Sequence, residues 1–239
     1  MAFQFMTRIP IPTLPYREGA LARAARFFPL VGLVIGLIAV AIDHLLAGRV
    51  APQVLGMVLL TYLVLITGAL HEDGLADTAD AFGGRRSKEQ ILSIMRDSRI
   101  GSYGAIALTL SLLARFIFIT DIPPLRLPQI VIAASVLCRW TSLPLGFLLP
   151  YAREDRGLGG QVAGRLPLSS IAWATLFAAV SVGAVLGRES VWPWAITILL
   201  TIGSALYFKR RIGGITGDCF GAANQITEIA IYFYGALRS

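Results

Sequence analysis

The chain has 239 residues, of which 56% are hydrophobic and 15% are charged, and its mean hydropathy is +0.70. Soluble domains carry about 25% charged residues and disordered chains carry few apolar ones, so this composition excludes both classes. On so apolar a chain, a net charge of +7 indicates membrane topology and phosphate binding rather than nucleic-acid binding. Two cysteines predict neither a disulfide framework nor a zinc cluster.

The first segment, Met1 to Pro15, lacks a continuous apolar core, and we expect no cleavable signal peptide there. Seven continuous apolar runs follow, each close to the length of about 20 residues with which a helix crosses a bilayer. They are Phe27–Leu46, Val54–Leu70, Gly104–Thr120, Ile130–Leu149, Ile171–Leu186, Val191–Tyr207 and Gly221–Leu237. The last run is the weakest candidate because Asn224, Gln225 and Glu228 lie within it.

The distribution of lysine and arginine predicts how these runs are oriented. Residues 1–26, 71–103, 150–170 and 208–220 hold 15 of the 21 basic residues, whereas the loops on the opposite side hold four. By the positive-inside rule, the first set faces the cytoplasm. We therefore expect an all-α integral membrane protein in the plasma (inner) membrane. Residues 1–239 would form one polytopic domain of about seven transmembrane helices, with a cytoplasmic-side active site.

An acidic cluster follows the second apolar run. On a helix, Asp73, Asp77 and Asp80 lie within roughly 60° of one another, whereas Glu72 points elsewhere. Three like charges on one face repel each other, and a hard cation such as Mg²⁺ turns that repulsion into coordination. The alternative is a solvated acidic helix end, which the helix dipole disfavours. His71 is the only histidine near these carboxylates.

The next polar segment combines a short helix with a basic cluster. Ser87 and Gln90 fit a capping box that opens the helix. Arg96, Asp97 and Arg99 then place two arginines around one carboxylate. This pattern is typical of a surface ion pair, but in this loop we favour phosphate recognition.

A second polar centre follows the sixth apolar run. Lys209 and Arg210 belong to a run of three cations, a pattern typical of a topology anchor or of contact with anionic lipids. The glycine-rich turn after them contains Thr216 and Asp218 and exposes backbone N–H groups that can hold phosphate oxygens. Asp218 could instead cap the seventh helix.

Two arginines and one glutamate lie well inside the apolar runs. Arg115 and Arg139 require carboxylate or carbonyl partners in a membrane, and Glu228 is a functional candidate because intramembrane carboxylates are costly. Arg139 and Trp140 could instead mark the membrane interface.

Taken together, these motifs resemble the cobalamin synthase (adenosylcobinamide-GDP ribazoletransferase) family, and the resemblance runs nearly end to end. The segments that carry it are residues 5–12 (FMTRIPIP), 28–32 (FPLVG), 71–80 (HEDGLADTAD), 94–101 (IMRDSRIG), 151–154 (YARE) and 213–218 (GGITGD). The patterns at 71–80 and at 213–218 are specific in combination. The chain departs from the family pattern at Glu72, Ala81 and Gln225.

The resemblance implies a membrane transferase that joins adenosylcobinamide-GDP to α-ribazole or its 5′-phosphate and releases GMP. Mg²⁺ is the expected cofactor, with the bilayer as a partner and homo-oligomerisation left open. The expected metal ligands are Asp73, Asp77, Asp80 and Asp218. The expected catalytic residues are Asp77, Asp80 as ligand or general base, and Asp97. The expected substrate-binding residues are His71, Arg96, Arg99, Lys209, Arg210, Thr216 and Glu228.

Two other classes compete with this interpretation. A CDP-alcohol phosphotransferase also displaces a nucleoside monophosphate at a membrane Asp cluster, but Asp77 stands where its motif requires Arg. A transporter would place polar groups at the midplane on broken, repeated helices, whereas here they concentrate at one face.

Overall fold

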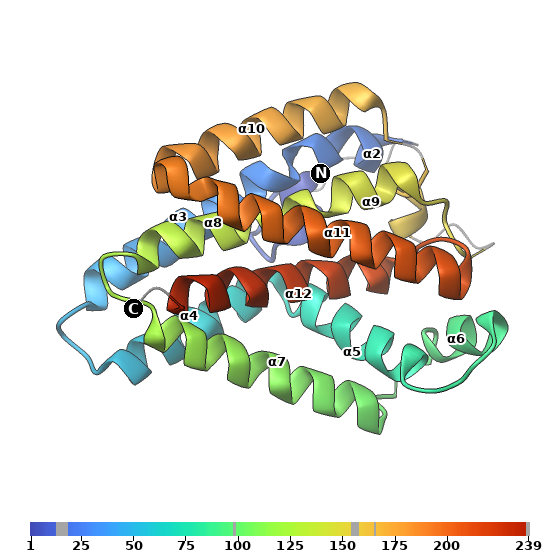
Figure 1. Cartoon of the computed structure of the whole chain (residues 1–239), viewed down its shortest axis with the longest axis horizontal. Coiled ribbons are helices and arrows are strands. Elements are labelled where there is room, and N and C mark those ends of the chain that lie inside the picture. The colour runs from blue at the N-terminus through green and yellow to red at the C-terminus, as the bar shows by residue number, and fades with distance from the viewer. Residues whose placement is uncertain (13–18, 98, 154–157, 165, 238–239) are drawn as a thin grey trace.

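The computed structural model describes all residues except 13–18, 98, 154–157, 165 and 238–239, and its described part is built from helices (Figure 1). These are α1 (Ala2–Met6), α2 (Ala20–Ala24), η1 (Ala25–Phe27), α3 (Phe28–Leu46), α4 (Pro52–Thr67), α5 (Leu70–Phe82), α6 (Lys88–Ile94), α7 (Ser102–Asp121), α8 (Leu127–Trp140), α9 (Ser142–Leu148), η2 (Leu158–Gln161), α10 (Leu168–Leu186), η3 (Gly187–Ser190), α11 (Val191–Ile212) and α12 (Gly217–Ala236). The all-α prediction is confirmed.

Several of these helices are long and apolar enough to cross a membrane. Four stretches of the described chain qualify, and the bent pair α4 and α5 adds a fifth if it counts as one span. The four are Ala20–Leu46, Ser102–Asp121, Leu127–Leu148 and Leu168–Ile212. The last stretch contains α10 and α11, which run in opposite directions from the turn at η3 (Figure 1). The expected multi-pass character is supported, and the count of seven stays a prediction.

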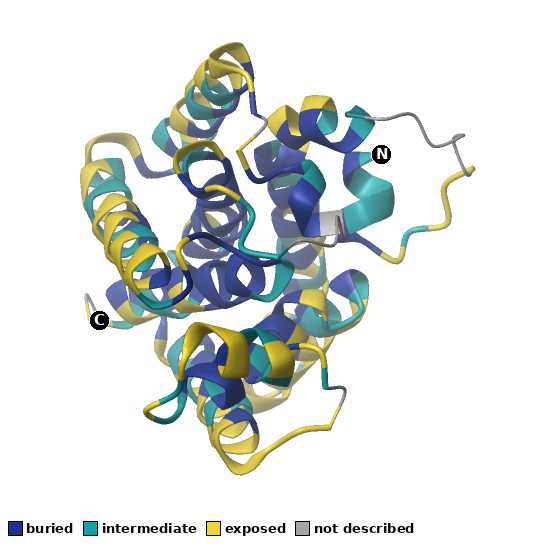
Figure 2. Ribbon diagram, turned by 90° about the vertical axis from the view of Figure 1, so that its right-hand side faces the viewer, coloured by how far each residue is buried: buried dark blue, intermediate teal, exposed yellow. Residues whose placement is uncertain are grey.

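Helix α12 occupies the centre of the bundle rather than its lipid-facing surface. It packs against α5, α7, α8 and α11, and α3 packs along α8 (Figures 1 and 2). Its buried residues include Asn224, Gln225 and Glu228, the polar side chains that weakened the prediction of a seventh span. Close packing of α3 on α8 requires a small residue, because a Cβ atom at Gly32 would collide with the backbone of Ser135.

The acidic segment forms a second buried helix, as the helical spacing of Asp73, Asp77 and Asp80 predicts. Gly68 and Ala69 both adopt left-handed backbone conformations, with φ of 65° and 59°. These two residues end α4 and turn the chain so that α5 leaves at 84° to it. Because α5 is rich in small residues, it packs along α12 and α7 inside the bundle. The second predicted span is therefore shorter, ending at Thr67.

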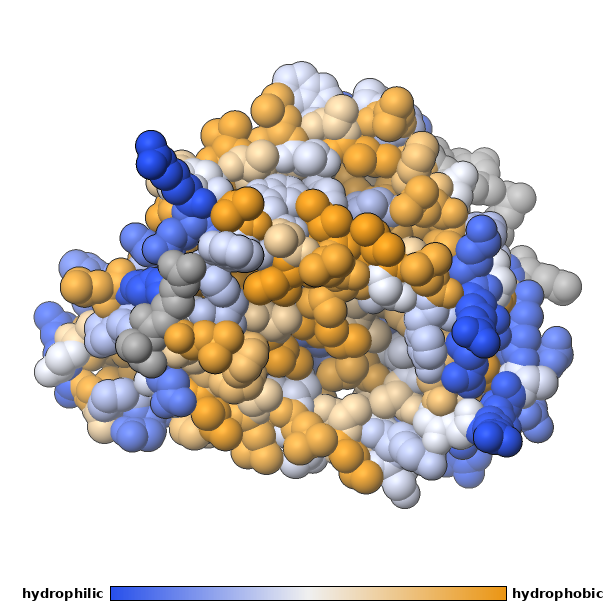
Figure 3. All heavy atoms as spheres, viewed as in Figure 1, coloured by the Kyte–Doolittle hydropathy of each residue, from blue (hydrophilic) through white to orange (hydrophobic). Residues whose placement is uncertain are grey.

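The surface of the molecule is divided along its long axis. On the face in Figure 3, apolar side chains cover the middle and hydrophilic ones gather at the two ends. The segments rich in lysine and arginine, which lie near α2, α6, α9 and the α11–α12 turn, meet at the same end (Figure 1). This arrangement agrees with an apolar belt around the middle of the bundle and with basic segments on one side of that belt.

Candidate active site

Two central helices bring three carboxylates to one surface, which we call the acidic face: Asp73 and Asp77 on α5 and Asp218 on α12. The helices touch at Gly74, where a Cβ atom would lie 2.8 Å from the carbonyl oxygen of Asp218. Asp73 is exposed, whereas Asp77 and Asp218 are half-buried. The carboxylate of Asp77 is repelled by those of Asp73 and Asp218, and Arg153 attracts it. Asp73, Asp77 and Asp218, which are expected to belong to one set of metal ligands, therefore lie on helices in direct contact.

Arg153 joins this face from a third part of the chain. A backbone bridge between Tyr151 and Ile215 holds its loop against the turn before α12. The guanidinium of Arg153 donates to Asp218 Oδ2 at 2.9 Å and to the carbonyl of Met95 at 3.1 Å. Burial raises the pKa of Asp218 above its usual value, and the charge of Arg153 opposes that rise.

Thr216, rather than Asp218, caps helix α12. Its buried hydroxyl accepts a hydrogen bond from the backbone N–H of Cys219 at 3.3 Å. The alternative that Asp218 serves as the cap is therefore wrong, and its carboxylate is left to face Arg153 and the acidic face. The predicted contact between Thr216 and substrate stays a prediction.

The structure places Asp80 apart from the acidic face, although Asp80 also influences Asp77 electrostatically. Its buried carboxylate accepts hydrogen bonds from the backbone N–H groups of Gly101 at 2.7 Å and Gly104 at 2.9 Å. A Cβ atom at Gly101 or Gly104 would collide with that carboxylate. Asp80 thus fastens the end of α5 to the start of α7. Its predicted roles as metal ligand and base stay predictions.

Asp97 and Arg99 form an exposed ion pair beside Asp80. The guanidinium of Arg99 donates to Asp97 Oδ2 at 2.6 Å and holds the pKa of Asp97 at about 2. Both side chains line a shallow hollow of about 370 Å³ together with Asp80 and Arg86. The Ser87–Gln90 capping box predicted just before this segment is confirmed.

Three hollows surround the acidic face. An apolar cavity of about 160 Å³ includes Asp73 and Asp218 in its wall. A second, the N-terminal hollow, measures about 430 Å³ and places Arg8 and Thr7 beside Asp73.

The third, which we call the basic hollow, measures about 460 Å³, and its charged lining consists of Lys88, Arg96 and Arg153 together with Glu89. Among the described residues that line these three hollows, neither Lys209 nor Arg210 is found. Both lie exposed in the last turn of α11.

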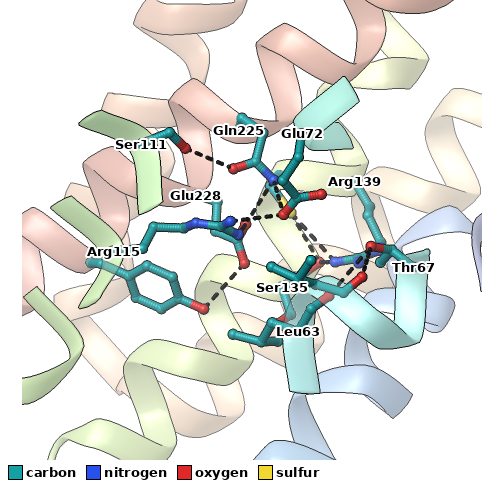
Figure 4. A network of polar contacts seen from close by, with 12 residues as sticks. Leu63, Thr67, Glu72, Ser111, Arg115, Ser135, Arg139, Gln225 and Glu228 are labelled. Atoms are coloured by element: carbon teal, nitrogen blue, oxygen red, sulfur yellow. Dashed lines mark hydrogen bonds and ion pairs between the residues drawn. The ribbon is translucent and has the colours of Figure 1, made fainter. Parts of the chain in front are cut away.

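The other faces of the same helices meet in a buried polar network (Figure 4). Arg115 on α7, only 1% exposed, donates to Glu72 at 2.8 Å and to Glu228 at 3.2 Å. Gln225 donates to both carboxylates, at 3.2 and 3.4 Å. The prediction of a carboxylate partner for Arg115 is confirmed, and Glu72 does point away from the acidic face. Glu228 faces Arg115 in this network, and its predicted contact with substrate stays a prediction.

Arg139 also has the kind of partner expected of an arginine inside an apolar run. Its guanidinium donates to the carbonyl oxygen of Ser135 at 2.9 Å. Arg139 is 3% exposed and lies inside the bundle, and the alternative that Arg139 and Trp140 mark the membrane interface stays a prediction.

The donor set of the acidic face suits a magnesium ion. Among the described residues, no three His, Cys, Asp or Glu side chains are grouped as a ready-made metal centre. Mg²⁺ needs no such centre, because it is commonly held by one or two carboxylates, waters and substrate phosphates. Asp73 and Asp77 provide two neighbouring carboxylates that no arginine pairs with among the ion pairs of the described chain.

Sequence reasoning missed two arginines at this site. Arg153 was noted only within the YARE motif, and Arg8 only within FMTRIPIP. Arg8 reaches the site because its backbone N–H donates to the carbonyl of Ile66 at 2.7 Å, next to the α4–α5 break. The available signal was that both residues lie in motifs on the same predicted side as the acidic cluster.

Comparison with known proteins identifies relatives along almost the whole chain. The family model for cobalamin-5-phosphate synthase matches residues 1–236. An adenosylcobinamide-GDP ribazoletransferase of Ralstonia nicotianae is 40% identical over 241 residues, covering 97% of this chain and 91% of the relative. That of Geotalea daltonii is 36% identical over 230 residues, covering 96% and 92%. No solved structure matches significantly.

Proposed function

Because the chain belongs to the cobalamin-5-phosphate synthase family, it is a transferase of cobalamin synthesis, and we propose that it transfers at the acidic face. The donor is adenosylcobinamide-GDP and the acceptor is α-ribazole or its 5′-phosphate. A ribose hydroxyl of the acceptor attacks the phosphorus linked to cobinamide, the bond to the bridging oxygen breaks, GMP leaves, and the hydroxyl proton is released to water. The observation that carries this proposal is the meeting of Asp73, Asp77 and Asp218 beside hollows lined by arginine.

Asp73 and Asp77 would hold Mg²⁺, with Asp218 beside them. When bound, the ion neutralises negative charge that develops on the diphosphate. The chain itself supplies cations on both sides, with Arg8 in the N-terminal hollow and Arg96 in the basic hollow. Arginine suits this task because its planar fork binds phosphate oxygens in pairs.

Arg153 and Asp80 take positioning roles in this proposal. Arg153 orients the Asp218 carboxylate and limits its negative charge. Asp80 supports the acidic face from behind by tying α5 to α7. Both are held by contacts within the protein, whereas the exposed Asp73 remains open to a substrate.

The active face would be cytoplasmic, in the inner membrane, with about seven crossings. Support comes from the apolar belt in Figure 3 and from the collection of basic segments at one end of the bundle. Alternate connections lie at opposite ends in Figure 1, as a multi-pass chain requires.

The test is a transfer assay with the detergent-purified full chain, Mg²⁺, adenosylcobinamide-GDP and α-ribazole. We expect GMP release in step with a corrinoid product of the mass of the joined molecule. Turnover of CDP-diacylglycerol with an alcohol, without corrinoid product, would move the chain to phospholipid synthesis and overturn the proposal.

A further inference from the structure

The phosphoryl transfer proposed above does not use the apolar cavity beside the acidic face. Its volume is about 160 Å³, and the rings of Phe5, Phe28 and Phe220 line it. Asp73 and Asp218 belong to the same wall, so the cavity opens toward the reacting groups. Because an apolar protein cavity of about 150 Å³ accommodates benzene, this space suits one flat aromatic group at the mouth of the site.

Part of the wall is bare backbone. Gly74, Gly159 and Gly217 line the cavity, and the first two touch backbone atoms across from them so closely that a side chain would collide. Gly217 differs, because a Cβ atom there would meet nothing within 4 Å. Position 217 therefore has room for a side chain, and it belongs to the cavity lining. The cavity can be filled by substitution without disturbing its frame.

Two residues that line the cavity each carry a buried polar atom without a partner in the described part of the protein: His71 Nε2 and Asn224 Oδ1. The residues are 5% and 2% exposed. The amide nitrogen of Asn224 donates to Ser142 Oγ at 3.1 Å and to the carbonyl of Phe220 at 2.8 Å, which fixes the direction of Oδ1. Buried polar atoms nearly always have partners, so these two indicate a ligand.

We propose that the cavity binds the aromatic base of the ribazole acceptor. His71 Nε2 donates to the unsubstituted ring nitrogen, and Asn224 Oδ1 accepts from a ribose hydroxyl. The inference rests on the proposed function, which supplies the identity of the acceptor. It adds where the acceptor lies and which residues recognise it. With the base seated there, the ribose lies beside Asp73 and Asp218.

The chemistry of the wall favours this base over the other rings of the reaction. The base of ribazole is a dimethylbenzimidazole, which is apolar apart from one acceptor nitrogen. Guanine carries several donors and acceptors along its edges, and two unpartnered atoms leave most of them unsatisfied. The corrin ring is far larger than the cavity. Three phenylalanine rings and two polar atoms therefore match the ribazole base best.

The test measures binding and turnover on the same preparations of the full chain in detergent. Equilibrium dialysis gives the Kd for α-ribazole, and the transfer assay gives KM for each substrate. Gly217→Val fills the cavity, and we expect its Kd and KM for α-ribazole to rise at least about tenfold while KM for adenosylcobinamide-GDP stays unchanged. Gly203→Val on α11 is the matched control, since its Cβ also meets nothing within 4 Å and Gly203 does not line the cavity.

A second variant tests the polar contact. His71→Phe keeps a flat ring and removes Nε2, whose loss breaks no hydrogen bond of the described protein. We expect about tenfold weaker α-ribazole binding with an unchanged melting temperature, since one hydrogen bond is lost only in the complex. A merely structural histidine would lower the melting temperature and leave Kd unchanged.

The outcomes separate this inference from the proposed function. Turnover in which Gly217→Val leaves Kd and KM for α-ribazole unchanged overturns the inference and keeps the function. A rise in KM confined to adenosylcobinamide-GDP overturns it in favour of guanine. If the unaltered chain binds α-ribazole, both variants weaken that binding and no transfer is detected, the cavity is supported as the α-ribazole site and the proposed function is contradicted. Absence of α-ribazole binding by the unaltered chain overturns the inference.

Discussion

Neighbouring residues on α5 belong to two polar regions of opposite character. Glu72 enters the buried network, where Arg115 lies 2.8 Å away and Gln225 lies 3.2 Å away. Asp73, the next residue, is exposed on the acidic face and borders two hollows. Both regions are shared with α12, through Glu228 in the network and Asp218 on the acidic face.

The difference shows how one pair of helices can provide both rigidity and chemistry. In the network, each charge faces a partner of opposite sign, as a charge buried in an apolar bundle requires. On the acidic face, like charges lie together without enough cations to balance them, an arrangement that structure alone does not favour. The network therefore holds α5, α7 and α12 in register, and in the proposed function this fixed register positions the acidic face to bind substrate.

The largest effect should come from breaking the network. Arg115→Met leaves Glu72 and Glu228 buried and unpaired, so we expect a loss of about 3–5 kcal/mol of unfolding free energy. Thermal unfolding in detergent, followed by circular dichroism, measures it. Arg126→Met is the matched control, because the pair of Arg126 with Glu189 is partly exposed and should contribute little. Equal melting temperatures for both variants would contradict a structural role for the network.

Removing one charge from the acidic face should lower the transfer rate without lowering the melting temperature. In Asp77→Asn we expect transfer to fall about 10²–10³-fold, because electrostatic stabilisation of the reacting phosphates is lost. The melting temperature should not fall, since the repulsion from Asp73 and Asp218 is relieved. Asp121→Asn, at the far end of α7, is the control carboxylate. Transfer at the normal rate by Asp77→Asn would remove Asp77 from the site.

Asp80 lies between the two regions, and its substitution sharpens the comparison. Asp80→Ala removes the acceptor of the Gly101 and Gly104 amides, so we expect a loss of about 2–3 kcal/mol of stability. Activity per folded molecule should fall much less than in Asp77→Asn. Complete loss of activity with an unchanged melting temperature would instead restore Asp80 as the base that the sequence predicts.

The smallest effect is expected at the exposed pair of Asp97 and Arg99. Because the pKa of Asp97 is about 2, the pair is charged at every pH at which transfer is assayed. Arg99→Ala should leave the melting temperature unchanged and alter KM for adenosylcobinamide-GDP by less than about twofold at any pH from 6 to 8. A tenfold rise in KM would show that Arg99 leaves Asp97 to bind phosphate.

The acidic face could be predicted from sequence because its spacing is local. Asp73 and Asp77 fall four residues apart on one helix, and Asp218 follows a glycine-rich turn of distinct composition. Asp80, three residues after Asp77, falls on the same predicted helix face, but its amide partners lie 21 and 24 residues away, which no local pattern reveals.

The sharp bend between α4 and α5 could not be predicted for a related reason. It depends on left-handed backbone at Gly68 and Ala69, and alanine gives no signal for that conformation. Likewise, helical periodicity cannot show that α12 lies at the centre of the bundle. Its polar side chains make the sequence resemble a weak membrane span, and only their partners on α5 and α7 explain why they are buried.

The most direct test of the central claim is metal removal followed by readdition. The purified full chain is treated with EDTA, Mg²⁺ is titrated back, and corrinoid product is measured for the unaltered chain and for Asp73→Asn. We expect EDTA to abolish transfer, Mg²⁺ to restore it, and the variant to need at least about tenfold more Mg²⁺ for half-maximal rate. Full transfer in EDTA, or an unshifted Mg²⁺ requirement in the variant, would contradict a magnesium-dependent acidic face.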